Sequence, residues 1–176
     1  WIANLFGMTV PDFFAAAAAG AGADELPVYL PYLLGRGAPF MDYVPDGSWR
    51  GLTASHRCED LCRSAVLGTL SALRQSGDLL EEIAGPRRRL VLQALACREA
   101  VVRTAAAGLF AAKQLLLPGN SEASLVGAAA LAYAGLGLAA DIPEAVARLF
   151  QATALPASAD DAVGRYYRRF LERQRG

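Results

Sequence analysis

The 176-residue sequence is poor in cysteine and histidine, which excludes several kinds of site. The sequence has three cysteines, Cys58, Cys62 and Cys97. This number is small and odd, which argues against a disulfide framework. No segment resembles a cleavable signal peptide, so we expect a cytoplasmic protein in a reducing environment. The single histidine, His56, rules out a two-histidine metal site. His56, Cys58 and Cys62 would still need a fourth ligand to bind zinc, so we predict no metal site and buried or half-buried thiols.

The usual nucleotide-binding motifs are also absent. No phosphate loop ending in Gly-Lys-Ser/Thr occurs, and the 20–22 segment, GAG, lacks the third glycine of a dinucleotide fingerprint. The 17 basic and 17 acidic side chains cancel, so overall charge gives no attraction to nucleic acid or an anionic membrane. We therefore interpret the arginines at 87–89 and in the last predicted helix as solvated, and we expect no nucleic-acid partner.

Charges are missing from one long stretch, the eighteen residues 123–140. This length would suffice for a membrane helix. Eight of the residues are alanine and three are glycine, which insert poorly compared with leucine or isoleucine. We expect a buried helix whose small side chains allow close packing, and no membrane partner. A membrane-associated apolar fragment is the alternative.

What is present indicates a folded α/β domain. Hydrophobic residues make up 54% and charged residues 19%, so residues 1–176 can bury a sizeable core as one domain. The chain begins with Trp1 rather than methionine, so we expect it to be a piece of a longer protein. Hydrophobic periodicity and turn residues predict where strands alternate with helices. The predicted strands are 28–33, 89–95 and 115–117; the predicted helices are 12–19, 59–76 closed by Gly77, 99–115, one from about Ser121, 143–152, and one capped by Ser158 or Asp160.

The last predicted helix and the 35–51 loop carry further patterns. In the helix, apolar side chains share one face: Ala162, Val163, Tyr166, Tyr167, Phe170 and Leu171. A loop as long as 35–51 is usually functional or disordered. Carboxylates flank it, namely Asp42, Asp46, Glu59 and Asp60. Paired carboxylates can act as acid and base, but no nucleophile or metal site accompanies them, so we expect them to cap and solvate the loop.

Several segments resemble the FGGY carbohydrate kinases, a family that includes xylulokinases and glycerol kinases. Residues 30–42 read LPYLLGRGAPFMD, residues 47–53 read GSWRGLT, and residues 60–66 read DLCRSAV. These follow the family's loop and second signature in order and spacing, although Leu67 replaces the usual glutamate. The 122–129 segment, EASLVGAA, and the tyrosine-rich ending YYRRF extend the resemblance nearly end to end.

The resemblance implies a fold related to actin and hexokinase. We expect residues 1–176 to be the C-terminal portion of the second lobe, a partial ribonuclease H-like lobe with a reduced sheet surrounded by helices. In the family, the catalytic aspartate, most sugar contacts and the phosphate loops lie in segments absent from this chain. We therefore assign it no catalytic residue and expect it to be inert alone. The parent protein would use ATP and magnesium to phosphorylate a sugar or polyol, and its N-terminal lobe would be the main partner.

One nucleotide-binding element of the family should remain, a glycine-rich turn that often reads GGGARS. Here the aligned residues 94–99 read ALACRE. By this alignment Ala96, Cys97 and Arg98 are the cofactor-binding candidates. Side chains in place of glycine should narrow the space for a purine, and Glu99 should disfavour phosphates. The parent is then either a divergent sugar kinase, which we favour, or a noncatalytic regulatory or structural homologue. Because the opening strands are missing, an exposed sheet edge could also support a homodimer.

Overall fold

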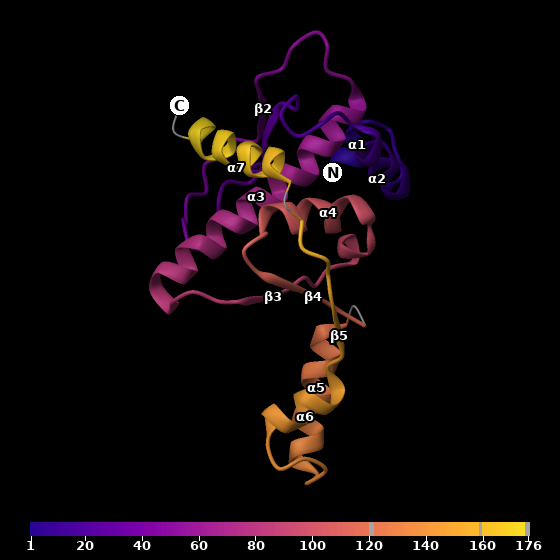
Figure 1. The fold of residues 1–176 in the computed structure, drawn as a ribbon, viewed down its shortest axis with the longest axis vertical. Coiled ribbons are helices and arrows are strands. Elements are labelled where there is room, and N and C mark those ends of the chain that lie inside the picture. Colours follow the sequence, from indigo (N-terminus) through magenta and orange to yellow (C-terminus); the bar gives the residue numbers. More distant parts are fainter. Residues whose placement is uncertain (120–121, 159, 175–176) are drawn as a thin grey trace.

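The computed structural model describes residues 1–119, 122–158 and 160–174, and helices surround two small β-sheets in this part of the chain (Figure 1). The helices are α1 (Ile2–Leu5), α2 (Val10–Ala19), α3 (Cys58–Ala84), α4 (Ala100–Leu109), α5 (Ala123–Gly135), α6 (Ile142–Leu149) and α7 (Asp161–Arg173), with a short 3₁₀ helix, η1 (Leu95–Arg98). The strands are β1 (Val28–Leu30), β2 (Ser48–Arg50), β3 (Arg89–Val91), β4 (Gln114–Pro118) and β5 (Ala152–Ala154).

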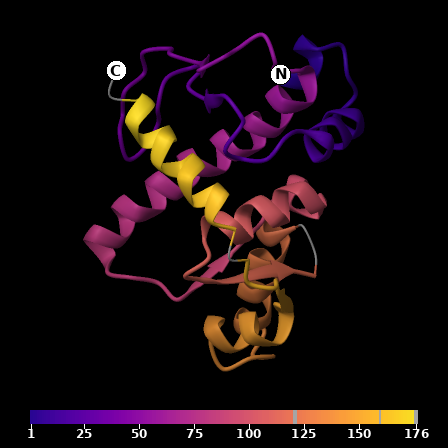
Figure 2. The same ribbon diagram turned by 45° about the horizontal axis from the view of Figure 1, so that its top comes forward.

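The longest helix, α3, is the centre of the core. Helices α2, α4 and α7 and strand β1 all pack against it. Figures 1 and 2 show α7 lying across α3 in both views. The apolar face predicted for the last helix is confirmed, since its buried residues are Val163, Tyr166, Tyr167 and Phe170. Full burial of a large apolar side chain contributes about 1.5–3 kcal/mol, so this face accounts for much of the packing energy of α7.

Tyr166 ties three elements of the core together. Its hydroxyl donates to the carbonyl oxygen of Ser64 on α3 at 3.0 Å and accepts from the backbone N–H of Tyr29 on β1, also at 3.0 Å. The side chain is fully buried, and this burial raises the pKa of the phenol. Because both bonds lie out of water, Tyr166 satisfies two buried backbone groups that would otherwise be unpaired.

Gly77 does not end α3 as the sequence predicted. The helix was expected to end at Gly77 but continues through it to Ala84. The glycine that ends it is Gly85, whose φ of 77° lies in the left-handed region that glycine adopts without strain. A glycine inside a helix costs only about 1 kcal/mol, which packing readily overrides. Gly68 has a separate role, because a Cβ there would lie 2.2 Å from the carbonyl oxygen of Tyr29.

The larger sheet has the strand order β3-β4-β5. Strands β3 and β4 are parallel and are joined through α4, whereas β5 runs antiparallel to β4. Among the described residues β3 pairs only with β4, so it forms one edge of this sheet. The strand predicted at 115–117 is confirmed within β4.

Three predicted boundaries near this sheet are wrong. The strand predicted for 89–95 ends at Val91, because the chain turns into η1. The helix predicted for 99–115 ends at Leu109, and a turn follows in which the N–H of Lys113 donates to the carbonyl of Phe110. The helix predicted for 143–152 ends at Leu149, and β5 follows as a strand that the sequence did not reveal.

The 35–51 loop begins and ends on paired strands. Strand β1 is shorter than the predicted 28–33, and β2 lies within the segment predicted to be loop. The two strands are antiparallel, and the rings of Tyr29 and Trp49 pack in a tilted arrangement at a centroid distance of 4.6 Å. Arg36 pairs with Asp42 at 2.7 Å and closes the loop between them.

Helices α5 and α6 project from the sheet as an arm (Figure 1). They pack against each other through buried alanines, with Ala130 and Ala145 fully enclosed. Several leucines of the arm stay exposed, including Leu131 at 60% and Leu136 at 75%, so the arm is less buried than the sequence predicted. The predicted start of α5 at Ser121 lies outside the described residues. Within the described part of the chain, no helix combines the length and hydropathy that a bilayer crossing requires.

Candidate functional site

The candidate site is the turn between β3 and α4, residues Ala94–Glu99. It follows a strand and precedes a helix, as the family resemblance requires. The N–H of Cys97 donates to the carbonyl of Ala94, and the N–H of Glu99 donates to that of Ala96, both at 3.0 Å. These bonds close the turn as the 3₁₀ helix η1. Ala94 has a φ of −169°, which is ordinary extended backbone, so the turn forms without a residue in the left-handed region.

The three candidate residues of this turn face different surroundings. Cys97 is buried in the main core, and this burial raises the pKa of its thiol. Ala96 is half-buried and packs against the same core. Arg98 is exposed on the surface of the turn. The turn therefore exposes Arg98 on its surface, whereas the thiol of Cys97 packs in the core.

Arg103 reinforces the turn from the next helix. Its Nη1 donates to the carbonyl oxygens of Cys97, at 3.4 Å, and of Arg98. Carbonyls at the end of a helical turn lack intrahelical partners, so this cation satisfies groups that would otherwise need water. Glu99 precedes α4 as its N-cap residue but makes no side-chain capping bond. Its carboxylate therefore lies at the N-terminal end of α4, where an anionic ligand would otherwise meet the helix dipole.

A small pocket lies beside the turn, where the parallel strands β3 and β4 end. Its volume is about 50 Å³, whereas ligand pockets usually measure at least roughly 300 Å³. Its lining residues come from both strand ends and the turn: Leu92, Gln93, Ala94, Arg98, Leu117, Pro118 and Gly119. Ligands of open α/β sheets bind outside the carboxyl ends of the strands. The position is therefore that of a ligand site, but the space would not hold a purine nucleoside.

Gln93 is the member of this pocket that sequence reasoning missed. Its Nε2 is buried and has no hydrogen-bond partner among the described residues. A buried donor without a partner costs about 1–3 kcal/mol, so it would gain from a ligand or water oxygen in the pocket. A glutamine inside a predicted apolar strand was the only signal available, and a polar residue at such a position is common in proteins that bind nothing there.

The histidine and cysteines near the start of α3 do not form a ligand set. Both ring nitrogens of His56 contact the backbone: Nδ1 accepts from the N–H of Thr53, and Nε2 donates to the carbonyl of Glu25, each at 2.8 Å. Cys62 is fully buried, and burial raises the pKa of its thiol to about 12. Among the described residues, no three histidine, cysteine or acidic side chains are grouped closely enough to hold an ion.

The carboxylates around the loop serve local structure, as predicted. Asp42 pairs with Arg36 and accepts from the N–H of Val44 at 3.2 Å. Asp60 accepts from the N–H groups of Ala21 at 2.8 Å and Arg57 at 2.9 Å. These two N–H groups hold the pKa of Asp60 below its usual value. The hydrogen bonds stabilise the ionised carboxylate and leave it poorly suited to act as a base.

Comparison with known proteins assigns the fold. Xylulose kinase from Lactobacillus acidophilus superposes with a TM-score of 0.85 at 22% identity, over 96% of this chain and 35% of that one. Xylulose kinase from Rhodospirillum rubrum gives 0.82 at 24% identity, over 99% and 36%. Glycerol kinase from Plasmodium falciparum, solved with ADP, gives 0.71 at 13% identity, over 94% and 34%. The predicted α/β fold, that of a lobe in the actin and hexokinase class, is confirmed.

The chain spans about a third of the length of these kinases. Residues 7–136, most of the sequence, match the profile described as "FGGY family of carbohydrate kinases, C-terminal domain". This range contains the loop, the second signature, the turn and α5. On this match, the chain belongs to the FGGY family of carbohydrate kinases and corresponds to their C-terminal domain.

Proposed function

We propose that residues 1–176 are the C-terminal portion of the second lobe of an ATP-dependent sugar or polyol kinase. The whole protein would transfer the γ-phosphoryl group of ATP to an alcohol group, with magnesium neutralising phosphate charge. The catalytic aspartate, most sugar contacts and the phosphate loops would belong to parts of the kinase outside this sequence. Alone, the chain would have no phosphotransferase activity.

The observation that carries this proposal is the superposition of nearly the whole chain on kinases of the family. The strand, turn and helix of β3, η1 and α4 also occur in the order that the family's nucleotide-side turn requires. The share of each kinase that is covered, about a third, supports an N-terminal lobe as the principal partner. The three free cysteines fit a reducing, cytoplasmic environment.

The residues of this turn do not fit ATP well. The pocket beside them measures about 50 Å³, and Leu95 adds a side chain, 69% exposed, where the family often has glycine. Glu99 places a carboxylate at the end of α4 that would otherwise attract phosphate. We therefore assign Ala96, Cys97 and Arg98 at most a weak contribution to nucleotide binding, and we derive no catalytic step through them.

The poor fit of the turn to ATP favours a second candidate function. A closed turn with bulky residues in place of the family's glycines would suit a regulatory or structural homologue that no longer binds ATP. The two candidates make opposite predictions for the whole protein. A divergent kinase holds ATP through other residues and turns over, whereas a noncatalytic homologue does neither.

The edge of the larger sheet suggests how two copies would associate. Strand β3 pairs on one side only within the described chain, and Val91 at its end is 42% exposed. An unpaired edge presents backbone N–H and C=O groups to another strand. A homodimer formed through β3 is therefore part of the proposal for the isolated chain.

Calorimetric titration of the 176-residue chain with ATP and magnesium tests whether this turn binds nucleotide weakly at most. We expect no saturation below about 1 mM, which corresponds to roughly −4 kcal/mol of binding free energy. Micromolar binding would contradict the interpretation of the turn. A variant with Ala94→Gly and Leu95→Gly should gain affinity if the missing glycines are the obstacle, and Leu73→Gly on the surface of α3 controls for a general loss of stability.

Assay of the whole protein separates the two candidate functions. ATP, magnesium and a panel of pentoses, hexoses and polyols would be supplied, and ADP release measured. Turnover with any member of the panel supports the divergent kinase. Neither turnover nor nucleotide binding by the whole protein would leave the noncatalytic homologue as the function.

A further inference from the structure

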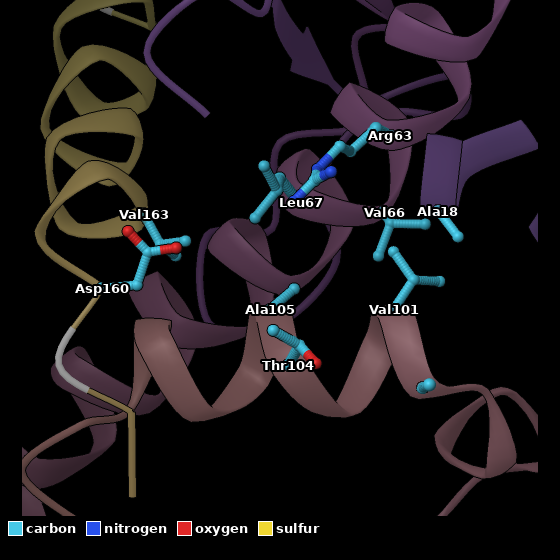
Figure 3. A pocket seen from close by; sticks show the side chains of 10 residues that line it. Ala18, Arg63, Val66, Leu67, Val101, Thr104, Ala105, Asp160 and Val163 are labelled. Atoms are coloured by element: carbon cyan, nitrogen blue, oxygen red, sulfur yellow. The ribbon is translucent and has the colours of Figure 1, made fainter. Parts of the chain in front are cut away.

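A second pocket lies among the helices, and the start of α4, directly after the turn, forms part of its wall. It is about 240 Å³ in volume and opens between α2, α3, α4 and the start of α7 (Figure 3). Most of its wall is apolar, with Val66 and Leu67 from α3, Val101 from α4 and Val163 from α7. Drug-sized ligands occupy pockets of roughly 300–1,000 Å³, so this one suits a smaller molecule.

Arg63 gives this apolar pocket a charged group. Its Nη1 donates to the carbonyl oxygen of Gly20 at 2.8 Å, which fixes the side chain against the end of α2. Figure 3 shows the guanidinium reaching from α3 toward Leu67. Arg63 is half-buried and forms no ion pair with any described carboxylate. A cation that is partly withdrawn from water without a counter-ion is costly, so an anion in the pocket would be stabilised.

The residue one helical turn after Arg63 supplies no counter-charge. Residues four apart on a helix lie on the same face, so the side chain of Leu67 lies beside that of Arg63. Leu67 is only 2% exposed and forms part of the apolar wall. The guanidinium of Arg63 therefore borders a mostly apolar space.

Asp160 limits where an anion could lie. It lines the pocket with Val163 on the α7 side, whereas Val66 and Val101 meet on the other side (Figure 3). Its carboxylate accepts from the N–H of Ala162 at 3.0 Å and so caps α7. A negative group is therefore favoured at the Arg63 side, and the part of the ligand near Asp160 should carry no negative charge.

We propose that this pocket binds a small organic monocarboxylate with a short hydrocarbon body. The carboxylate accepts hydrogen bonds from the guanidinium of Arg63, which presents a planar pair of donors to such a group. The hydrocarbon body packs on Val66, Val101 and Val163. A single cation and apolar walls favour one negative charge on an apolar body over a heavily hydrated phosphate dianion.

Titration of the 176-residue chain with hexanoate, followed by NMR shifts of the valine and leucine methyl groups, tests the proposal. We expect saturable shifts at Val66, Val101 and Val163. The neutral analogue 1-hexanol should bind at least about tenfold more weakly, because it lacks the charge-assisted bond. Inorganic phosphate should leave these methyl signals unchanged. No saturation up to about 10 mM hexanoate, or equal binding of hexanol or phosphate, would overturn the proposal.

Two variants of the pocket sharpen this test. Arg63→Gln should weaken hexanoate binding by at least about tenfold, whereas Arg88→Gln on an exposed site should leave it unchanged. Leu67→Glu supplies an internal carboxylate one helical turn from Arg63, and it should also abolish binding. Circular dichroism would establish that each variant keeps the native helix content. Undiminished binding by a folded Arg63→Gln protein would refute the role of the guanidinium.

Discussion

Two glycines of the same helix should respond in opposite directions to alanine substitution. At Gly68, an added Cβ would lie 2.2 Å from the carbonyl oxygen of Tyr29, whereas ordinary contacts begin at 3.4 Å. At Gly77, an added Cβ meets nothing within 4 Å. Both residues lie inside α3, so the helical backbone is common to both substitutions and only the surroundings differ.

The clash at Gly68 has no simple relief. Strand β1 would have to retreat by about 1 Å, yet Tyr29 is held by the hydroxyl of Tyr166 and by the ring of Trp49. Overpacking of this kind costs about 1–3 kcal/mol, and the rigid backbone neighbour places Gly68→Ala at or above the upper end. Gly77→Ala should instead stabilise the protein by about 0.5–1 kcal/mol through helix propensity.

Urea unfolding followed by tryptophan fluorescence and circular dichroism would measure both free energies of unfolding. For a chain of this size 1 kcal/mol shifts Tm by about 2–4 °C, so Gly68→Ala should lower Tm by roughly 6 °C or more. Gly77→Ala should raise it by about 1–4 °C. If the two variants were equally stable, the close approach of α3 and β1 would be wrong.

Three further predictions concern the core, the loop and the sheet edge. Tyr166→Phe orphans the N–H of Tyr29 and removes a bond to Ser64, so urea unfolding should show a loss of about 2–4 kcal/mol; a loss below about 0.5 kcal/mol would contradict this. The pKa of Asp60 is lowered in the fold, so its contribution is complete above about pH 4 and is lost as pH falls through the lower, folded-state pKa. The Tm difference between wild type and Asp60→Asn should therefore shrink below about pH 4, and a pH-independent difference would exclude this linkage. Val91→Lys should shift sedimentation toward monomer if β3 mediates dimerisation, and unchanged sedimentation of a dimeric chain would exclude this edge.

Sequence reasoning located the apolar face of α7 and most of α2 well, because helical periodicity is a local property. The predicted 12–19 helix starts two residues after the observed start of α2 at Val10. In α2, the side chain of Thr9 accepts from the N–H of Asp12 at 3.3 Å, and Pro11 lies in the first turn. Family resemblance added the order of the loop, the signature and the turn, none of which periodicity could have assigned.

Boundaries decided by tertiary contacts were less predictable. Strand β5 is three exposed residues, Ala152–Ala154, whose strand geometry comes from pairing with β4 rather than from their own preference. Gly77 and Gly85 look equivalent in sequence, but only Gly85 adopts a positive φ. The candidate turn was placed correctly between strand and helix, yet its 3₁₀ closure and the unpaired amide of Gln93 depend on neighbours that the sequence does not reveal.

The position of Tyr166 has a consequence for biosynthesis. Ribosomes synthesise proteins from the amino-terminal side, so β1 and α3 emerge long before the side chain that joins them, which lies 137 residues after Tyr29. Until then the N–H of Tyr29 lacks its hydrogen bond to Tyr166, and the face of α3 that packs against α7 stays exposed. Contacts so distant along the chain slow folding, so the core should close late, and a chaperone that shields α3 should raise the yield.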